Sequence, residues 1–481
     1  MISFLLSIAV LVLGYLIYGR VIERIFGPDG RQTPAIAHPD GVDYIAMPTW
    51  KVFMIQFLNI AGTGPIFGAI MGAWFGPASY LWIVLGCIFA GSVHDYLSGM
   101  MSLRHDGAGL PELVGKYMGG TMRIIMLVFS MLLLLMVGAV FVYSPASILA
   151  GIGGSEIMWF IVIFIYYIIA TLMPIDKIIG KIYPLFAIAL IFMALGLLVC
   201  LLIKMPSIPE IWNIGNMDSW MSAQSHNGTD LLGLKEYLTK NTLFPAMFIT
   251  IACGAISGFH ATQSPLMARC LKSEKLGRPV FYGSMITEGL VALVWAAVSS
   301  WFFYSGGWRE VLPQDAVNEF LAQVGNTDGK SLIQYFNAPA VVKLVCSSWL
   351  GVAGGILAML GVVAAPITSG DTALRSARLI IADFLKFDQK PIAKRLMIAV
   401  PMFAAVLLLL IWQLTNPDGF NVLWQYFGWS NQTLSVFTLW TITIYLYKRK
   451  KCYWVTLIPA IFMTAVSLTF IVQQVISQAM N

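Results

Sequence analysis

Charged residues are scarce in this chain. Of its 481 residues, only 11% are Asp, Glu, Lys or Arg, while 58% are hydrophobic. Soluble domains carry about 25% charged residues, because their surfaces face water. The composition therefore excludes a soluble globular protein and indicates a chain that lies largely within a membrane.

The sequence also lacks the short motifs that mark several classes of protein. No CxxC pair or histidine cluster accompanies its six cysteines, so neither a disulfide framework nor a zinc site is expected. Walker and dinucleotide-binding motifs are absent, which excludes a pump with its own ATPase domain. No HExxH, paired-carboxylate or nucleophile motif suggests an enzyme. We therefore expect no catalytic residue, no metal ligand and no cofactor, apart from H+ or Na+ as a coupling ion.

Apolar runs of about 20 residues, the length that crosses a bilayer, recur from end to end. The first run lacks an A-x-A cleavage pattern and a basic n-region, since the first cation is Arg20. We therefore expect it to stay in the mature protein as a helix. The twelve predicted spans are residues 2–18, 50–74, 79–101, 122–150, 157–174, 182–203, 243–266, 279–303, 342–369, 396–414, 421–446 and 453–477.

Most of the 29 Lys and Arg residues fall in alternate connecting segments. If both termini are extracytoplasmic, all of these segments face the cytoplasm, as the positive-inside rule expects. The net charge of +6 then reflects topology, and no nucleic-acid partner is expected. The expected partners are the lipid bilayer and a small-molecule substrate, and the sequence does not indicate an oligomeric state.

Two predicted spans contain residues that interrupt a helix at mid-depth. In the second span, Gly64-Pro65 cannot continue a regular helix without losing a hydrogen bond, and Gly62 frees the backbone. The seventh span places two glycines, a histidine, hydroxyls, a glutamine and a proline between residues 252 and 265. Two alternatives remain open: the glycines could let helices pack closely, and His260 could be a core residue whose hydrogen bonds are satisfied.

The two interruptions lie five spans apart, and the spans that contain them cross in opposite directions. This pattern is typical of an inverted repeat that holds its substrate between discontinuous helices. Helix N-termini at such breaks suit a carboxylate. A polar run in the eleventh span, residues 430–432, is expected to face the bundle interior. The predicted substrate-binding residues are Ala61, Gly62, Thr63, Gly64, Gly254, Ser257, Gly258, His260, Gln263 and Asn431.

Ionisable groups at membrane depth are costly and usually functional. Glu288 lies well inside the eighth span and must be protonated or paired there. We expect it to be the proton-coupling carboxylate, and a structural hydrogen bond to a neighbouring helix is the alternative. His94 and Asp95 lie near the cytoplasmic end of the third span. They are further candidates for ion coupling, unless they are only interfacial.

The ninth span ends in a group of oxygen-bearing side chains, Thr368, Ser369 and Asp371. Such a group could bind a hard cation such as Na+, so these residues are also candidates for ion coupling. The same residues could instead form an N-cap, at Ser369 or Asp371, that starts a cytoplasmic helix. Asp371 and Arg375 have the i, i+4 spacing of a helical ion pair.

Five segments of the chain are long enough to be specific: QFLNIAGTGPIFG (56–68), GSVHDY (91–96), ACGAISGFHATQSPLMARC (252–270), TSGDTALRSAR (368–378) and WQYFGWSNQTL (424–434). Together they resemble the carbon starvation protein A (CstA) family. The resemblance implies an inner-membrane carrier of the amino acid–polyamine–organocation superfamily with a LeuT-like fold. It further implies uptake of peptides or pyruvate driven by an ion gradient, with protons as the expected ion.

The predicted fold is an all-α polytopic membrane protein with a LeuT-like 5+5 inverted repeat and one extra transmembrane helix at each end. We expect a secondary active importer of a small carboxylate-bearing nutrient in the bacterial plasma membrane. A channel or a nutrient-sensing receptor is the alternative. The predicted segments are an N-terminal helix and linker (1–49), a first repeat (50–203), an extracytoplasmic loop (204–242), a second repeat (243–446) and a C-terminal helix (447–481).

Overall fold

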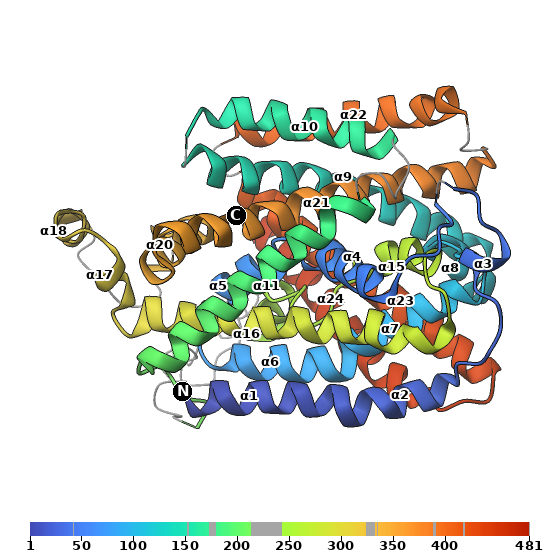
Figure 1. The fold of residues 1–481 in the computed structure, drawn as a ribbon, viewed down its shortest axis with the longest axis horizontal. Helices are drawn as coiled ribbons and strands as arrows, with labels where there is room; N and C mark the ends of the chain where they lie inside the picture. Colours follow the sequence, from blue (N-terminus) through green and yellow to red (C-terminus); the bar gives the residue numbers. More distant parts are fainter. Residues whose placement is uncertain are drawn as a thin grey trace.

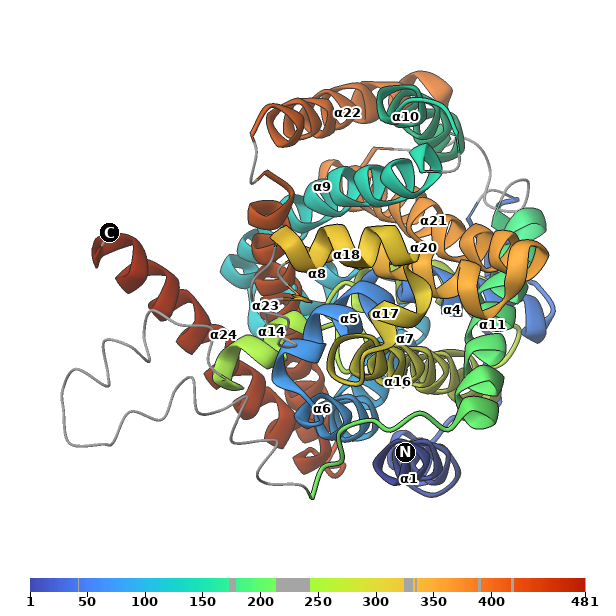
Figure 2. The ribbon, with the colours of Figure 1, turned by 90° about the vertical axis from the view of Figure 1, so that its left-hand side faces the viewer.

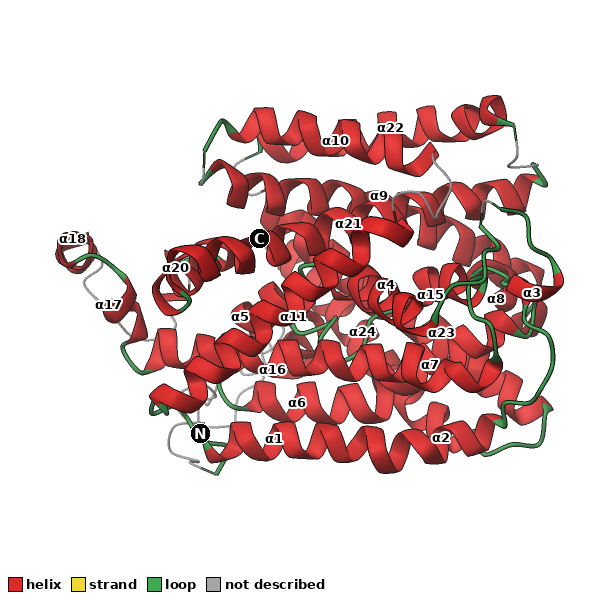
Figure 3. Cartoon of the chain, viewed as in Figure 1, coloured by secondary structure: helices red, strands yellow, loops and turns green. Residues whose placement is uncertain are grey.

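A computed structural model describes residues 1–41, 43–151, 153–172, 179–212, 243–323, 332–333, 335–387, 391–416 and 419–480. These residues form helices joined by loops, and no strand occurs among them (Figure 3). Of the predicted extracytoplasmic loop 204–242, residues 213–242 lie outside the described part of the chain. The all-α architecture predicted from the apolar runs is confirmed.

Up to residue 204, the chain forms α1 (Ile2–Leu13), η1 (Gly14–Tyr18), α2 (Gly19–Phe26), α3 (Pro34–Ala37), α4 (Thr49–Ala61), η2 (Gly64–Gly68), α5 (Ala69–Gly72), η3 (Ala73–Phe75), α6 (Ala78–Gly86), η4 (Cys87–Gly91), α7 (Ser92–Leu103), α8 (Leu110–Met118), α9 (Gly120–Ala150), α10 (Glu156–Leu172) and α11 (Ile179–Lys204). From residue 243 it forms η5 (Leu243–Met247), α14 (Phe248–Thr250), α15 (His260–Ala268), η6 (Glu274–Leu276), η7 (Arg278–Tyr282), α16 (Gly283–Tyr304), α17 (Gly307–Val311), α18 (Gln314–Gln323), α20 (Ala338–Trp349), α21 (Gly351–Leu385), α22 (Ile392–Thr415), α23 (Gly419–Lys448) and α24 (Trp454–Met480).

The twelve predicted spans all correspond to helical segments. Among the described residues, eight helices are long and apolar enough to cross a membrane, and a bent pair makes a ninth. The remaining three differ from a regular span for visible reasons. Helix α10 is short, the segment from η5 to α15 is interrupted, and α23 carries the polar run at Ser430–Gln432. The chain is therefore a multi-pass membrane protein.

The long helices lie side by side, and corresponding helices of the two halves pack together (Figure 1). The fourth and ninth spans, α9 and α21, pack along each other, and the fifth and tenth, α10 and α22, also contact each other. Figures 1 and 2 show α10 and α22 as an outer layer over α9 and α21. Ile161 and Leu408 of this layer are exposed, as expected for a face in contact with lipid. This arrangement is the LeuT-like inverted repeat.

The predicted ninth span is wrong at both ends. Helix α20 stops at Trp349, because Gly351 has a positive φ of 65° that breaks the helix. Helix α21 then runs without interruption to Leu385, well beyond the predicted end at residue 369. The predicted loop between the eighth and ninth spans, residues 304–341, contains α17, α18 and the first four residues of α20 (Figure 2).

The linker between the first two spans lies across the end of the molecule opposite the two termini (Figure 1). Thr33 Oγ1 donates a hydrogen bond to the carbonyl of Leu271 at 2.5 Å, and the N–H of Met47 donates to the carbonyl of Cys270 at 3.1 Å. The carboxylate of Asp43 lies 3.6 Å from Arg375 Nη1 of α21. The linker thus ties the segment after α15 to α21.

We expect the substitution Asp43→Asn to loosen this linker, because it removes a carboxylate that neutralises the fully buried Arg375. Cys270 is buried, and its thiol donates to the carbonyl of Asp43 at 3.9 Å. Its labelling by a membrane-permeable maleimide should therefore become several-fold faster. The measurement uses a Cys452→Ser background, since Cys452 is exposed, with the labelled site identified by peptide mass spectrometry.

Asp106→Asn is the matched control, because Asp106 contributes only its backbone carbonyl to the hydrogen bond from Tyr44. Equal labelling rates of Cys270 in the Asp43→Asn and wild-type proteins would show that the linker is held by its other contacts.

Candidate functional site

The second span is broken where the sequence predicted it. Helix α4 ends at Ala61, Gly62 follows with φ 45° and ψ −145°, and the π-helical turn η2 begins at Gly64. The two halves of the span are bent by 51°. Residues with a side chain rarely adopt the backbone conformation of Gly62, which explains why a glycine is needed there.

The seventh span is interrupted over a longer stretch. Helix α14 ends at Thr250 and α15 starts at His260, so residues 251–259 form an unwound segment without regular helix. Non-helical backbone at membrane depth occurs where it is buried in protein or lines a cavity. Here the residues of the unwound segment are fully or nearly fully buried.

The two interruptions face each other. A Cβ placed on Gly64 would overlap Cβ and Sγ of Cys253, so only a glycine allows the unwound segment to come this close. Gly254 lies on the same side, because a Cβ built on it would lie 3.9 Å from the Cα of Pro65. The predicted pairing of two broken helices is therefore present in the structure.

Asn431 of α23 holds the unwound segment in place. Its side-chain oxygen accepts hydrogen bonds from Ser257 Oγ at 3.0 Å and from the N–H of Phe259 at 2.7 Å. Its backbone carbonyl accepts from the N–H of Gly258 at 3.2 Å. Four of the predicted binding residues, Gly254, Ser257, Gly258 and Asn431, thus lie together, and Asn431 stabilises the N-terminus of α15.

Two histidines and two carboxyl groups form a buried cluster beside the unwound segment. The carboxylate of Asp95 is 2.7 Å from Nδ1 of His94 and 2.8 Å from Nδ1 of His260. On the far side of the ring, His260 Nε2 is 3.5 Å from a carboxyl oxygen of Glu288. All four side chains are fully buried, which argues against the interfacial alternative for His94 and Asp95. Below, "acid–histidine cluster" means His94, Asp95, His260 and Glu288.

Hydrogen bonding in this cluster indicates how its rings are oriented. An ionised carboxylate only accepts hydrogen bonds, so Asp95 can accept from the Nδ1–H of both imidazoles. In a neutral ring, the lone pair of His260 then lies on Nε2 and faces Glu288. Neither this nitrogen nor either oxygen of Glu288 has a hydrogen-bond partner within the described ranges. The alternative for Glu288, a structural hydrogen bond to a neighbouring helix, is therefore not seen among the described residues.

The second group of candidate ion-coupling residues contacts α4 through Ser369. Ser369 Oγ donates to the carbonyl of Leu58 at 3.0 Å. Tyr183 of α11 donates its hydroxyl hydrogen to Asp371 at 2.5 Å. Thr368 Oγ1 donates back to the carbonyl of Ala364 at 2.9 Å.

The N-cap interpretation of Ser369 and Asp371 is wrong. Both residues lie in the interior of α21, which continues from Gly351 to Leu385. The physical reason is that mid-helix serine and threonine hydroxyls can donate to carbonyl oxygens instead of capping a new helix. Asp371 uses its carboxylate to accept from Tyr183, a contact between distant parts of the chain.

Several polar side chains near the breaks were not predicted as site residues. Gln56 and Asn59 are three residues apart on α4, fully buried, and their amide groups have no hydrogen-bond partner in the described part of the chain. The same holds for the hydroxyl of Thr63 and for Oε1 of Gln263, two predicted residues. Polar side chains at helical spacing in an apolar span are the signal that could have identified Gln56 and Asn59.

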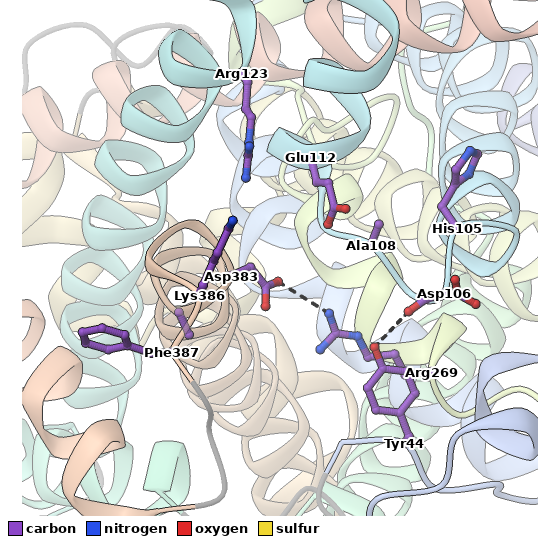
Figure 4. A pocket seen from close by; sticks show the side chains of 11 residues that line it. Tyr44, His105, Asp106, Ala108, Glu112, Arg123, Arg269, Asp383, Lys386 and Phe387 are labelled. Atoms are coloured by element: carbon purple, nitrogen blue, oxygen red, sulfur yellow. Dashed lines mark hydrogen bonds and ion pairs between the residues drawn. The ribbon is translucent and has the colours of Figure 1, made fainter. Parts of the chain in front are cut away.

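A separate cavity of about 650 Å³ opens at the end of the molecule where the linker lies (Figure 4). Arg269 forms an ion pair with Asp383 at 3.8 Å and donates from Nε to the carbonyl of Gly107 at 3.0 Å. The Tyr44 hydroxyl donates to the carbonyl of Asp106 at 2.9 Å. Partial burial lowers the pKa of His105 at its rim, because it disfavours the charged ring. The predicted site residues do not line this cavity.

Comparison with solved structures supports the fold. A manganese transporter of Eremococcus coleocola aligns with a TM-score of 0.54 over 90% of this chain and 89% of that chain, at 12% sequence identity. Identity this low shows similarity of fold alone.

Sequence comparison identifies closer relatives. An uncharacterized membrane protein of Haemophilus influenzae is 44% identical over 63% of this chain and 91% of its own length. A protein of Escherichia coli named "Peptide transporter CstA" is 26% identical over 96% of this chain and 79% of its own length. The family model described as "Carbon starvation protein CstA" matches residues 1–204 and 145–470. The chain therefore belongs to the carbon starvation protein CstA family.

Proposed function

We propose that this protein is a secondary active importer of a small carboxylate-bearing nutrient, either a short peptide or pyruvate. It would work by alternating access in the bacterial inner membrane, with both termini extracytoplasmic. The observation that carries the proposal is the meeting of two broken helices at Gly64 and Cys253. In transporters, such paired breaks hold the substrate while one bundle of helices rocks against the other.

The polar groups around the breaks support a substrate of this kind. Thr63, Asn59 and Gln56 are buried side chains with unused hydrogen-bonding capacity among the described residues. Buried polar atoms without partners are costly, so a polar ligand is the natural occupant beside them. Relatives named peptide transporters fit a substrate with a carboxylate and amide groups.

We further propose that protons drive the uptake. The acid–histidine cluster provides two carboxyl groups and two imidazoles in a buried chain next to the unwound segment. Ionisable chains of this type serve as proton relays in membrane carriers. The alternative coupling ion, Na+, would use the oxygens of Thr368, Ser369 and Asp371.

The test is uptake of radiolabelled dialanine and pyruvate into proteoliposomes that contain the purified protein. We expect accumulation of at least one of the two when the outside is acid, and its loss when a protonophore collapses the gradient. Accumulation driven by a Na+ gradient alone would overturn proton coupling and favour Na+ binding by the oxygens of Thr368, Ser369 and Asp371. Uptake unaffected by collapse of both gradients would overturn the secondary transport mechanism.

A further inference from the structure

Three side chains of different chemical types converge beside the α4 break. Cys253 comes from the unwound segment, His260 begins α15 and Glu288 belongs to α16. Each offers one ligand atom, and the three atoms, Sγ, Nε2 and a carboxyl oxygen, lie within 4.8 Å of one another. All three residues are buried.

The separation of His260 Nε2 and the Glu288 carboxyl group suits a bound cation. His260 Nε2 and Glu288 approach to 3.5 Å, which is too long for a hydrogen bond. Neither Nε2 nor the two oxygens of Glu288 has a hydrogen-bond partner among the residues described. In tetrahedral zinc sites, bonds of about 2.0–2.1 Å place neighbouring nitrogen and oxygen ligands about 3.3–3.4 Å apart. The observed separation is close to that value.

The surroundings of His260 have the arrangement that supports a metal-binding imidazole. Metal-bound histidines almost always donate their other ring N–H to a carboxylate or carbonyl, which fixes the orientation of the ring. Asp95 lies at 2.8 Å from Nδ1 of His260 and is itself held by His94 at 2.7 Å. Nε2 is thereby left to face Glu288 and Cys253. The amide of Asn431 donates to Cys253 Sγ at 3.6 Å, a contact that suits a thiolate.

We propose that Cys253, His260 and Glu288 form a binding site for Zn2+ or a similar borderline transition-metal ion. Thiolate, imidazole and carboxylate together are typical of Zn2+, with a fourth position open to water, whereas Mg2+ and Ca2+ prefer oxygen ligands alone. A bound ion ties the unwound segment to α16 and restrains movement between them. The proposal depends on the geometry of the three side chains and not on the proposed transport function.

The test is a Co2+ titration of the purified full-length protein in detergent, after reduction and removal of metals with a chelator. Cobalt replaces zinc in such sites, and a cobalt–thiolate bond gives a charge-transfer band in the near ultraviolet. We expect this band to appear at one equivalent of Co2+, and Zn2+ to abolish it by competition. The site contains a single thiolate, so Cys253→Ser should remove the band.

Matched variants distinguish Co2+ binding at this site from nonspecific Co2+ binding. Cys346→Ser should keep the band, because Cys346 is an equally buried cysteine on α20 outside the cluster. Asp95→Asn should weaken Co2+ binding about 10–100-fold, as expected for a residue that orients a ligand. Glu288→Gln retains the thiol but loses a ligand, so it should weaken binding still more.

Size-exclusion profiles and thermal unfolding without metal establish that each variant is folded. No band in the wild-type protein, or a band that persists in Cys253→Ser, would overturn the proposal. If Cys253→Ser does not fold, wild-type affinity in Glu288→Gln would overturn it instead. The titration contains no substrate, so its failure is distinct from a failure of the transport assay.

Discussion

Replacing Glu288 by Gln is expected to abolish concentrative uptake while leaving substrate exchange in place. Glu288 is a fully buried carboxyl group that faces His260 Nε2 at 3.5 Å, and glutamine keeps its size but cannot carry a proton. With one proton per substrate, a gradient of one pH unit is worth about 1.4 kcal/mol, or about tenfold accumulation. In proteoliposomes, the variant should equilibrate its substrate without accumulating it.

Glu112→Gln is the matched control, because Glu112 is an exposed carboxylate at the rim of the separate cavity. It should accumulate substrate as the wild-type protein does. Both variants are assayed in a buffer with chelator, so that loss of a metal ligand cannot explain the result. Normal accumulation by Glu288→Gln would exclude Glu288 from the coupling mechanism.

Gly64→Ala is expected to destabilise the protein by about 1–3 kcal/mol, the usual cost of inserting a methyl group into a packed interior. The added Cβ would overlap Cβ and Sγ of Cys253, so the two broken helices could not keep their contact. Thermal unfolding in detergent should show a lower midpoint. Uptake should fall as well, because the substrate contacts of both breaks would shift.

A second substitution tests whether this contact is the cause. The double variant Gly64→Ala/Cys253→Gly removes the cysteine side chain. The new methyl group of residue 64 then lies 3.7 Å from the Cα of residue 253, an ordinary contact distance. The double variant should therefore recover much of the lost stability. Gly120→Ala is the control, since a Cβ there meets nothing within 4 Å. If the double variant recovers no stability, the destabilisation by Gly64→Ala has a cause other than overlap with Cys253.

The helix breaks could be predicted because their cause is local. Gly62 ends α4 because it adopts a conformation that other residues avoid, and Gly64-Pro65 starts the next helical turn, where a proline needs no backbone N–H. Likewise, the spacing of apolar runs is enough to place the twelve helical segments. Helix boundaries were less predictable where the polarity of a segment misleads, as at Ser369 and Asp371 in the interior of α21.

The composition of the acid–histidine cluster could not be predicted, because it depends on packing between distant parts of the chain. His94, Asp95, His260 and Glu288 were each expected to be functional, but nothing in the sequence pairs Asp95 with His260 across 165 positions. For the same reason, the sequence did not predict that Cys253 lies beside His260 and Glu288. The ligand atoms of the proposed metal site come from three separate segments, without the sequence spacing of a known motif.

The contacts of Asn431 restrict how the site can move. Because its side chain and its backbone carbonyl both hold residues 257–259, α23 and the start of α15 are joined by hydrogen bonds into one unit. In the proposed alternating-access mechanism, a rotation that exposes the site to one side of the membrane would carry these two elements together. In the second span, the corresponding position is Gly62, where the two helical halves meet at an angle of 51°. If the proposed transport mechanism holds, we expect α23 and α15 to move as one unit and the second span to change its angle at Gly62.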